Sequence, residues 1–74
     1  MTTKTLISKL SVINNNSDTY SEYREAALSE VDHAIAGETD KEKLDTLKTV
    51  RLLIEKPDTD DIEYVHNQVL DMLE

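Results

Sequence analysis

The sequence contains no cysteine, phenylalanine or tryptophan, and it has one glycine and one proline among 74 residues. Without cysteine the chain has no disulfide and no thiol nucleophile, and this absence fits a cytoplasmic protein. A single glycine leaves no glycine-rich loop to hold a phosphate group. The two histidines have no catalytic partner in the sequence. We therefore expect a protein that is not an enzyme and that needs no cofactor.

Long apolar runs are also absent from the sequence. No stretch approaches the roughly 20 apolar residues that a membrane span requires. Residues 1–13 lack the apolar core of a signal peptide. We expect no membrane association and a cytoplasmic location.

Charge is distributed unevenly along the chain, whose formal net charge is −8. Residues 1–16 contain two lysines and no acid, whereas residues 58–74 contain six acids and no base. Residues 17–37 contain five acids and one arginine, and residues 38–57 contain five of each sign. Such a surface repels nucleic acid and anionic lipid, and it favours a protein partner with a basic surface.

The clearest helix signal lies in residues 39–57. Thr39 followed by Glu42 predicts a capping box at its start. Pro57 ends the helix, because proline has no N–H donor and restricts the residue before it. At 100° per residue, the apolar side chains fall on one face. This face consists of Leu44, Leu47, Val50, Leu53 and Ile54.

Three other segments show the same helical period. Residues 3–13 predict a short helix that ends at the asparagines of residues 14–16. A capping box of Thr19 and Glu22 begins the next helix, which ends at Gly37 in a left-handed conformation. Asp58 caps the last helix. The three apolar faces are Leu6, Leu10 and Ile13; Tyr20, Tyr23, Ala27, Val31, Ala34 and Ile35; and Ile62, Val65, Val69, Met72 and Leu73.

These signals predict an all-α fold in one domain, residues 1–74. The expected architecture is a small antiparallel bundle of three main helices, residues 18–36, 40–56 and 59–73, with a short N-terminal helix, residues 3–13. A chain of this length hides only about 60% of its unfolded surface, so self-association is an available source of stability. We expect a homodimer. Its interface candidates are Leu28, Leu52, Leu70 and Arg51.

Two Glu-x-x-His pairs have the spacing of metal ligands in di-iron bundles: Glu30 with His33, and Glu63 with His66. His33 lies about 150° from the centre of its helix's apolar face, counting 100° per residue. His66 lies at the border of its own face. Because the first helix also has no acid to complete such a site, we interpret His33 as solvated and His66 as a boundary residue, and expect no metal.

The basic residues do not predict DNA binding, and the two arginines each have two possible roles. The five bases of residues 38–57 are matched by five acids, so a helix-turn-helix built from the middle helices would have no net attraction for phosphate. Arg24 and Arg51 each fall inside an apolar face. Each side chain either packs its stem and extends its charge into solvent, or forms a buried or interfacial salt bridge to an acid on a partner helix, and the sequence leaves both alternatives open.

Acidic residues form a stripe on the second helix, with Asp18, Glu22, Glu25 and Asp32 on one side. Carboxylates three or four residues apart are spaced about 5 to 6 Å along a helix, which is close enough to a row of phosphates to imitate DNA. The alternative is that these carboxylates face solvent and bind no partner. On the last helix, Tyr64 points away from the apolar face, beside Asp60 and Asp71.

Part of the pattern resembles that of a known family. The relevant features are Leu28-Ser29-Glu30-Val31, Gly37, the apolar run Leu44, Leu47, Leu52 and Leu53 that ends in Glu55, the acidic linker of residues 58–61, and residues 64–70. In these features the chain resembles the small two-component-system connector and biofilm-regulator proteins of enteric bacteria. The resemblance implies a helical, non-enzymatic dimer that binds a signalling protein. The acidic last helix and the lysines of the first segment depart from that pattern, which puts a DNA-binding role in doubt.

The leading hypothesis is a non-enzymatic, acidic helical module that regulates or inhibits a protein partner in signalling or transcription. The alternative is a DNA-mimic inhibitor of a nucleic-acid-binding protein, of phage origin. The candidate partner-binding residues are Asp18, Glu22, Glu25, Asp32, Asp60, Tyr64 and Asp71.

Overall fold

Four helices make up the fold. The computed structural model describes residues 2–74, and all regular structure within them is helical, which confirms the all-α class. Helix α1 spans Thr3–Asn16, α2 spans Tyr20–Gly37, α3 spans Lys41–Glu55 and α4 spans Ile62–Leu73. The N-terminal helix has 14 residues and is longer than α4, which has 12. In this part of the chain, no helix is both long and apolar enough to cross a membrane.

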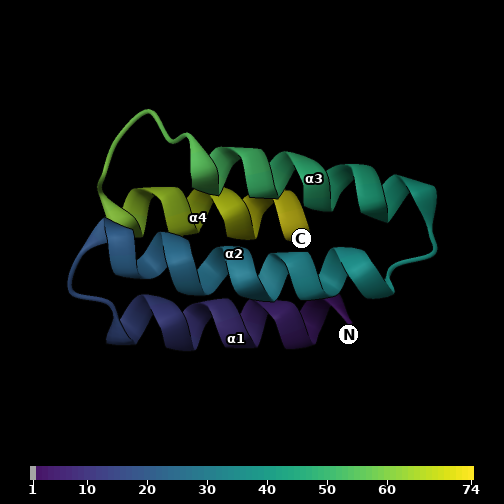
Figure 1. Ribbon diagram of the computed structural model, residues 1–74, viewed down its shortest axis with the longest axis horizontal. Helices are drawn as coiled ribbons and strands as arrows, with labels where there is room; N and C mark the ends of the chain where they lie inside the picture. The colour runs from purple at the N-terminus through teal and green to yellow at the C-terminus, as the bar shows by residue number, and fades with distance from the viewer. Residues whose placement is uncertain (1) are drawn as a thin grey trace.

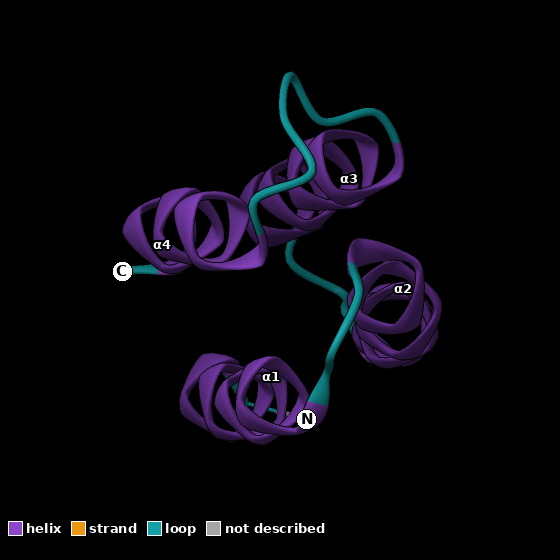
Figure 2. Ribbon diagram, turned by 90° about the vertical axis from the view of Figure 1, so that its left-hand side faces the viewer, coloured by secondary structure: helices purple, strands orange, loops and turns teal. Residues whose placement is uncertain are grey.

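The helices pack around a common axis in the order of the chain. The packed pairs are α1 with α2, α2 with α3, α3 with α4, and α4 with α1. Figure 1 shows the connecting loops at alternate ends of the molecule, and Figure 2 shows the helices at four corners. Consequently α2 and α4 lie at opposite corners, and so do α1 and α3. The solvent-facing sides of α2 and α4 therefore point in opposite directions.

The predicted apolar faces form one core, to which every helix contributes. Its buried members are Leu6 and Leu10; Tyr20, Tyr23, Ala27, Val31 and Ala34; Leu47, Val50 and Ile54; and Val65 and Val69. The other predicted members are partly buried: Ile13, Ile35, Leu44, Leu53, Ile62, Met72 and Leu73. Because Leu6 and Leu10 are 1% and 0% exposed, α1 is docked on the other helices.

The predicted capping box at the start of α2 is confirmed. The Thr19 hydroxyl accepts a hydrogen bond from the Glu22 N–H at 3.3 Å, and the Glu22 carboxylate accepts one from the Thr19 N–H at 3.2 Å. These two bonds satisfy two of the N–H groups that a helix start leaves without a backbone partner.

The predicted start of α3 at Thr39 is wrong by one residue. Asp40 is the N-cap, and its carboxylate accepts from the N–H groups of Glu42 and Lys43 at 2.9 and 3.2 Å. The Glu38 carboxylate accepts from the Thr39 and Asp40 N–H groups, both at 3.1 Å. With the amides of this turn bonded to two carboxylates, Thr39 forms no capping box with Glu42.

The start of α4 also differs from the prediction, because Asp61 rather than Asp58 is the N-cap. The Asp61 carboxylate accepts from the Tyr64 N–H at 3.3 Å. Residues 58–61 are therefore a linker that follows the predicted stop at Pro57, and the helix begins only at Ile62.

Two predicted helix ends need correction. Helix α1 continues through the asparagines to Asn16. The Asn16 amide donates to the Val12 carbonyl at 2.8 Å, and the Ser17 hydroxyl donates to the Ile13 carbonyl at 2.6 Å, so side chains satisfy carbonyls of the last turn. Gly37 is the last residue of α2 and is not left-handed, since no glycine in the described chain has a positive φ.

The docking of α1 predicts a large loss of stability on substitution of Leu10. Leu10→Ala should lower the free energy of unfolding by about 2 to 5 kcal/mol, because it leaves a cavity in a close-packed core. That is a large share of the roughly 5 kcal/mol expected of a small domain. Urea unfolding followed by far-UV circular dichroism measures the change.

The matched control for this prediction is Val12→Ala, on the same helix. The Val12 side chain is 59% exposed, so this variant should change stability by about 0.5 kcal/mol or less. Equal stability of the Leu10 and Val12 variants would show that α1 does not dock.

Candidate protein-interaction surface

A hydrogen bond between two polar aromatic side chains joins opposite corners of the bundle. The Tyr23 hydroxyl on α2 and His66 Nδ1 on α4 lie 3.2 Å apart, and their rings meet edge to face with centroids 5.9 Å apart. Tyr23 is 0% exposed and His66 is 4% exposed. The prediction of His66 as a boundary residue is thus wrong. Periodicity within α4 could not reveal a partner on α2.

Burial favours the neutral forms of both side chains. Desolvation raises the pKa of Tyr23, with a further increase from nearby Tyr20. Desolvation also lowers the pKa of His66 below its ordinary value of 6.5. When the neutral imidazole carries its proton on Nε2, its Nδ1 accepts a hydrogen bond from the Tyr23 hydroxyl. This arrangement satisfies two polar groups in the middle of an otherwise apolar core.

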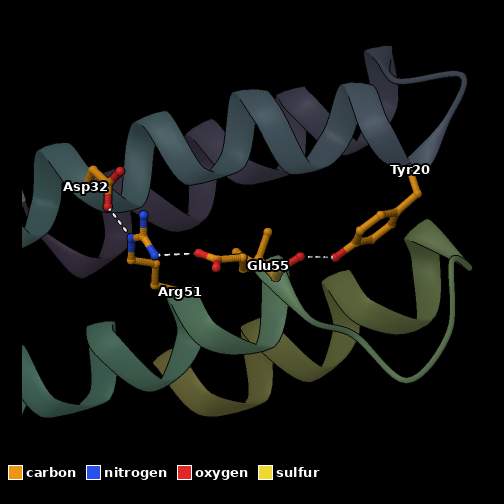
Figure 3. Close-up of polar contacts among 5 residues, drawn as sticks. Tyr20, Asp32, Arg51 and Glu55 are labelled. Carbon is orange, nitrogen blue, oxygen red and sulfur yellow. Dashed lines mark hydrogen bonds and ion pairs between the residues drawn. The ribbon is translucent and has the colours of Figure 1, made fainter.

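Tyr20 caps the C-terminal end of α3. Its hydroxyl donates to the Ile54 carbonyl at 2.6 Å, as Figure 3 shows. The last four carbonyls of a helix have no partner within the helix, so this bond satisfies one of them. Burial raises the pKa of Tyr20, and the positive charge of Arg24 opposes the rise. The Arg24 guanidinium lies over the Tyr20 ring, 5.2 Å from its centroid.

Arg51 links α3 to α2 on the surface. Its Nε donates to the Asp32 carboxylate at 2.7 Å, and its Nη1 donates to the Glu55 carboxylate at 2.6 Å (Figure 3). These hydrogen bonds, that to Asp32 first, raise the pKa of Arg51. Arg51 thus combines features of both alternatives, because it pairs with an acid of a neighbouring helix while its side chain stays 41% exposed. All three side chains are about half exposed, so solvent screens the pairs.

The predicted acidic stripe of α2 is only partly available to a partner, and Asp18 lies in the loop before the helix, which begins at Tyr20 and not at residue 18. Glu22 belongs to the capping box, and Asp32 is paired with Arg51. Asp18 and Glu25 are exposed, and within residues 2–74 neither carboxylate has a hydrogen bond or ion pair. Two of the four carboxylates thus have intramolecular roles: the capping role of Glu22 was predicted from the sequence, and the pairing of Asp32 with Arg51 was not.

The exposed side of α4 carries an aromatic ring among acids. Tyr64 is 53% exposed, and Asp60 and Asp71 are exposed as well. Asp71 lies seven residues after Tyr64, which is about two turns along the same helix face. The Tyr64 hydroxyl accepts a hydrogen bond from the Gln68 amide at 3.3 Å. No basic residue occurs between residues 58 and 74.

The candidate partner-binding residues do not form one surface. The set on α2 and the set around α4 belong to helices at opposite corners of the bundle (Figure 2). A single flat partner can therefore contact only one set at a time. We call the group of Asp60, Glu63, Tyr64 and Asp71 the α4 surface, and the pair Asp18 and Glu25 the α2 surface.

The dimer candidates differ in how much of each side chain solvent can reach. Leu52 on α3 is 59% exposed, whereas Leu28 and Leu70 are partly buried. Leu28 packs against the core. Arg51 is occupied by its two ion pairs. Leu52 is therefore the one large apolar side chain among the four that stands mostly free.

The Glu-x-x-His pairs do not come together. His33 is exposed, as predicted, and His66 is inside the core against Tyr23. Glu30 lies 3.5 Å from the Lys9 ammonium instead. Across residues 2–74, no three His, Asp or Glu side chains gather closely enough to hold a metal ion.

Comparisons with known proteins found no match to the chain. No protein-family model matches the chain, and neither a curated protein nor a solved structure matches it.

The buried His66 predicts stability that depends on pH. Because its folded-state pKa lies below 6.5, the unfolded chain binds more protons near that pH, and stability rises with pH. The contribution is complete above about pH 6.5 and is lost as the pH falls from there through the lower folded-state pKa. Urea unfolding between about pH 5 and 7.5 should show this slope.

Substitution of each histidine tests the assignment of this slope. His66→Gln should flatten it, because the titrating group is gone. His33→Gln should leave it unchanged, because His33 is exposed. An equal slope in all three proteins would contradict the assignment to His66.

Proposed function

We propose that the chain is a non-enzymatic, acidic protein-interaction module, an antiparallel helical bundle that regulates or inhibits a signalling or transcription-related partner by covering part of the partner's surface. One observation carries the proposal. Tyr64 is 53% exposed, and it stands in the segment with six acids and no base.

An exposed tyrosine among carboxylates suits recognition of a basic protein. Tyrosine buries a large area at low conformational cost, and it is enriched at the centres of interfaces. The surrounding carboxylates attract a basic surface from a distance and so raise the rate of encounter. A lysine or arginine of the partner also gains a cation–π contact with the ring.

Gln68, on the same helix, supports this role for Tyr64. Its amide donates to the Tyr64 hydroxyl at 3.3 Å from one turn further along α4. This bond restricts the ring before a partner arrives, and a restricted side chain loses less entropy on binding.

A DNA-mimic inhibitor of phage origin is the alternative function. It would use the α2 surface, where Asp18 and Glu25 are exposed and have no polar partner in residues 2–74. The engagement of Glu22 and Asp32 within the fold reduces the row of free charges, so the α4 surface has the stronger support.

The proposal predicts that Tyr64→Ala weakens partner binding by about tenfold or more, as loss of an aromatic anchor does at other interfaces. The measurement is capture from a lysate of the source cells on immobilised protein, followed by titration of the captured partner. Val12→Ala is the matched control, because Val12 is a 59% exposed apolar residue on another helix.

Charge variants separate the two functions. The triple variant Asp60→Asn, Glu63→Gln, Asp71→Asn should lose binding and its salt dependence if the α4 surface binds the partner. The double variant Asp18→Asn, Glu25→Gln should lose both if the chain mimics DNA. Full binding by Tyr64→Ala and by the triple variant would exclude the α4 surface.

We also propose that the chain forms a homodimer through a surface that includes Leu52. Light scattering at micromolar concentration should then give about twice the monomer mass of 8.4 kDa. Leu52→Asp should restore the monomer, because a buried unpaired carboxylate opposes association. The circular dichroism spectrum should stay unchanged, since Leu52 is outside the core. Monomer alone in the unsubstituted protein would contradict the dimer.

A further inference from the structure

A partly enclosed cavity lies at one end of the bundle, where α1 and α3 begin and α2 and α4 end. All four helices line it, and its volume is about 160 Å³. In Figure 1 this is the end that carries the N label and the loop between α2 and α3. The cavity is distinct from the α2 and α4 surfaces, which lie on the sides of the bundle.

The floor of the cavity is apolar. Leu6, Ala34 and Leu47 form its buried part, and each is 7% exposed or less. Met72 and Leu73 of α4 add two partly buried side chains. An apolar cavity of about 150 Å³ in another protein stays dry and binds benzene. The volume of about 160 Å³ includes the polar mouth, which Thr2, Thr3 and Thr46 also line, so the whole cavity has room for about one six-membered ring or a short alkyl chain.

The mouth of the cavity carries one cation without a partner. Lys43 is exposed and lines the cavity, and none of the ion pairs within residues 2–74 includes it. Glu38 also lines the cavity. One of its carboxylate oxygens already accepts hydrogen bonds from two backbone N–H groups, those of Thr39 and Asp40.

The helix dipoles at this end largely offset one another. Two helices begin here with their positive ends, and two end here with their negative ends. Lys43 and Glu38 are then the two charged side chains that line the cavity. The Glu38 carboxylate is engaged by two backbone N–H groups, whereas the Lys43 ammonium has no partner in residues 2–74 and is the group that can pair with an anionic ligand.

We propose that this cavity binds a small organic monocarboxylate, with an apolar body of about one ring on the floor and the carboxylate at the Lys43 ammonium. Burial of the apolar body supplies the driving force. The charge-assisted hydrogen bond to Lys43 fixes the orientation. This binding site is independent of the proposed protein partner.

The test is titration of the isotope-labelled protein with 3-phenylpropionate, followed by amide chemical shifts. Salt at about 0.15 M limits the reach of the net negative charge to roughly 8 Å. Saturable shifts should appear near residues 3–6, 34–38 and 43–47, with a dissociation constant on the order of 1 mM for a ligand of this size. No saturation up to about 10 mM, or shifts centred elsewhere, would overturn the proposal.

A matched pair of lysine variants tests the carboxylate contact. Lys43→Gln should weaken binding by about two- to fivefold, because the ammonium is exposed and an exposed ion pair contributes at most about 1 kcal/mol. Lys48→Gln removes an exposed cation from the same helix outside the cavity and should leave the affinity unchanged. Equal affinities of the two variants would overturn the role of Lys43.

Two further measurements test the apolar floor and the head group. The neutral analogue 3-phenylpropan-1-ol should bind the unsubstituted protein about as weakly as the carboxylate binds Lys43→Gln. Equal affinity for the alcohol and the carboxylate would overturn selection by charge. Ala34→Leu should fill the floor and abolish binding. If this variant does not fold, the shift map of the unsubstituted protein decides whether the floor is the site.

Discussion

The buried hydrogen bond between Tyr23 and His66 crosses the core and links α2 to α4, one of the two diagonal pairs of helices that share no extensive interface. A core without phenylalanine or tryptophan has few large side chains, and Tyr23 is the largest one that is fully buried. Placing a tyrosine there brings a hydroxyl into an apolar interior, which costs free energy unless a partner is present. His66 on the opposite corner provides that partner. The positions of α2 and α4 are thereby fixed relative to each other.

Once α2 and α4 occupy opposite corners, α1 and α3 fill the space between them, and the contacts that follow are of two kinds. Inside, Tyr20 satisfies a carbonyl at the end of α3. Outside, Arg51 of α3 pairs with Asp32 of α2, and Lys9 of α1 lies near Glu30 of α2. Acids of α2 thus pair with one basic side chain from α1 and one from α3, whereas within residues 2–74 no basic side chain pairs with an acid of α4. The segment of residues 58–74, in which Tyr64 is exposed, therefore keeps an excess of negative charge.

Local features could be predicted from the sequence, and contacts between helices could not. The Thr19 and Glu22 capping box needs only four consecutive residues, and the apolar faces need only the helical period. At the start of α3, the acids at 38 and 40 compete with Thr39 for the same amides, so spacing alone selected the wrong cap. The burial of His66 and the pairing of Asp32 depend on residues of other helices. The separation of the two acidic surfaces depends on the circular packing order.

The opposite placement of α2 and α4 has a consequence for how a basic molecule approaches. Each of the two sides carries carboxylates without a polar partner in residues 2–74, so the proposed basic partner would be attracted from either direction. Discrimination between the sides must then arise at short range, after arrival, where only one of them offers an aromatic ring. In the proposed function, attraction at long range would thus come from both sides of the protein, and selection at short range would come from the exposed Tyr64 ring.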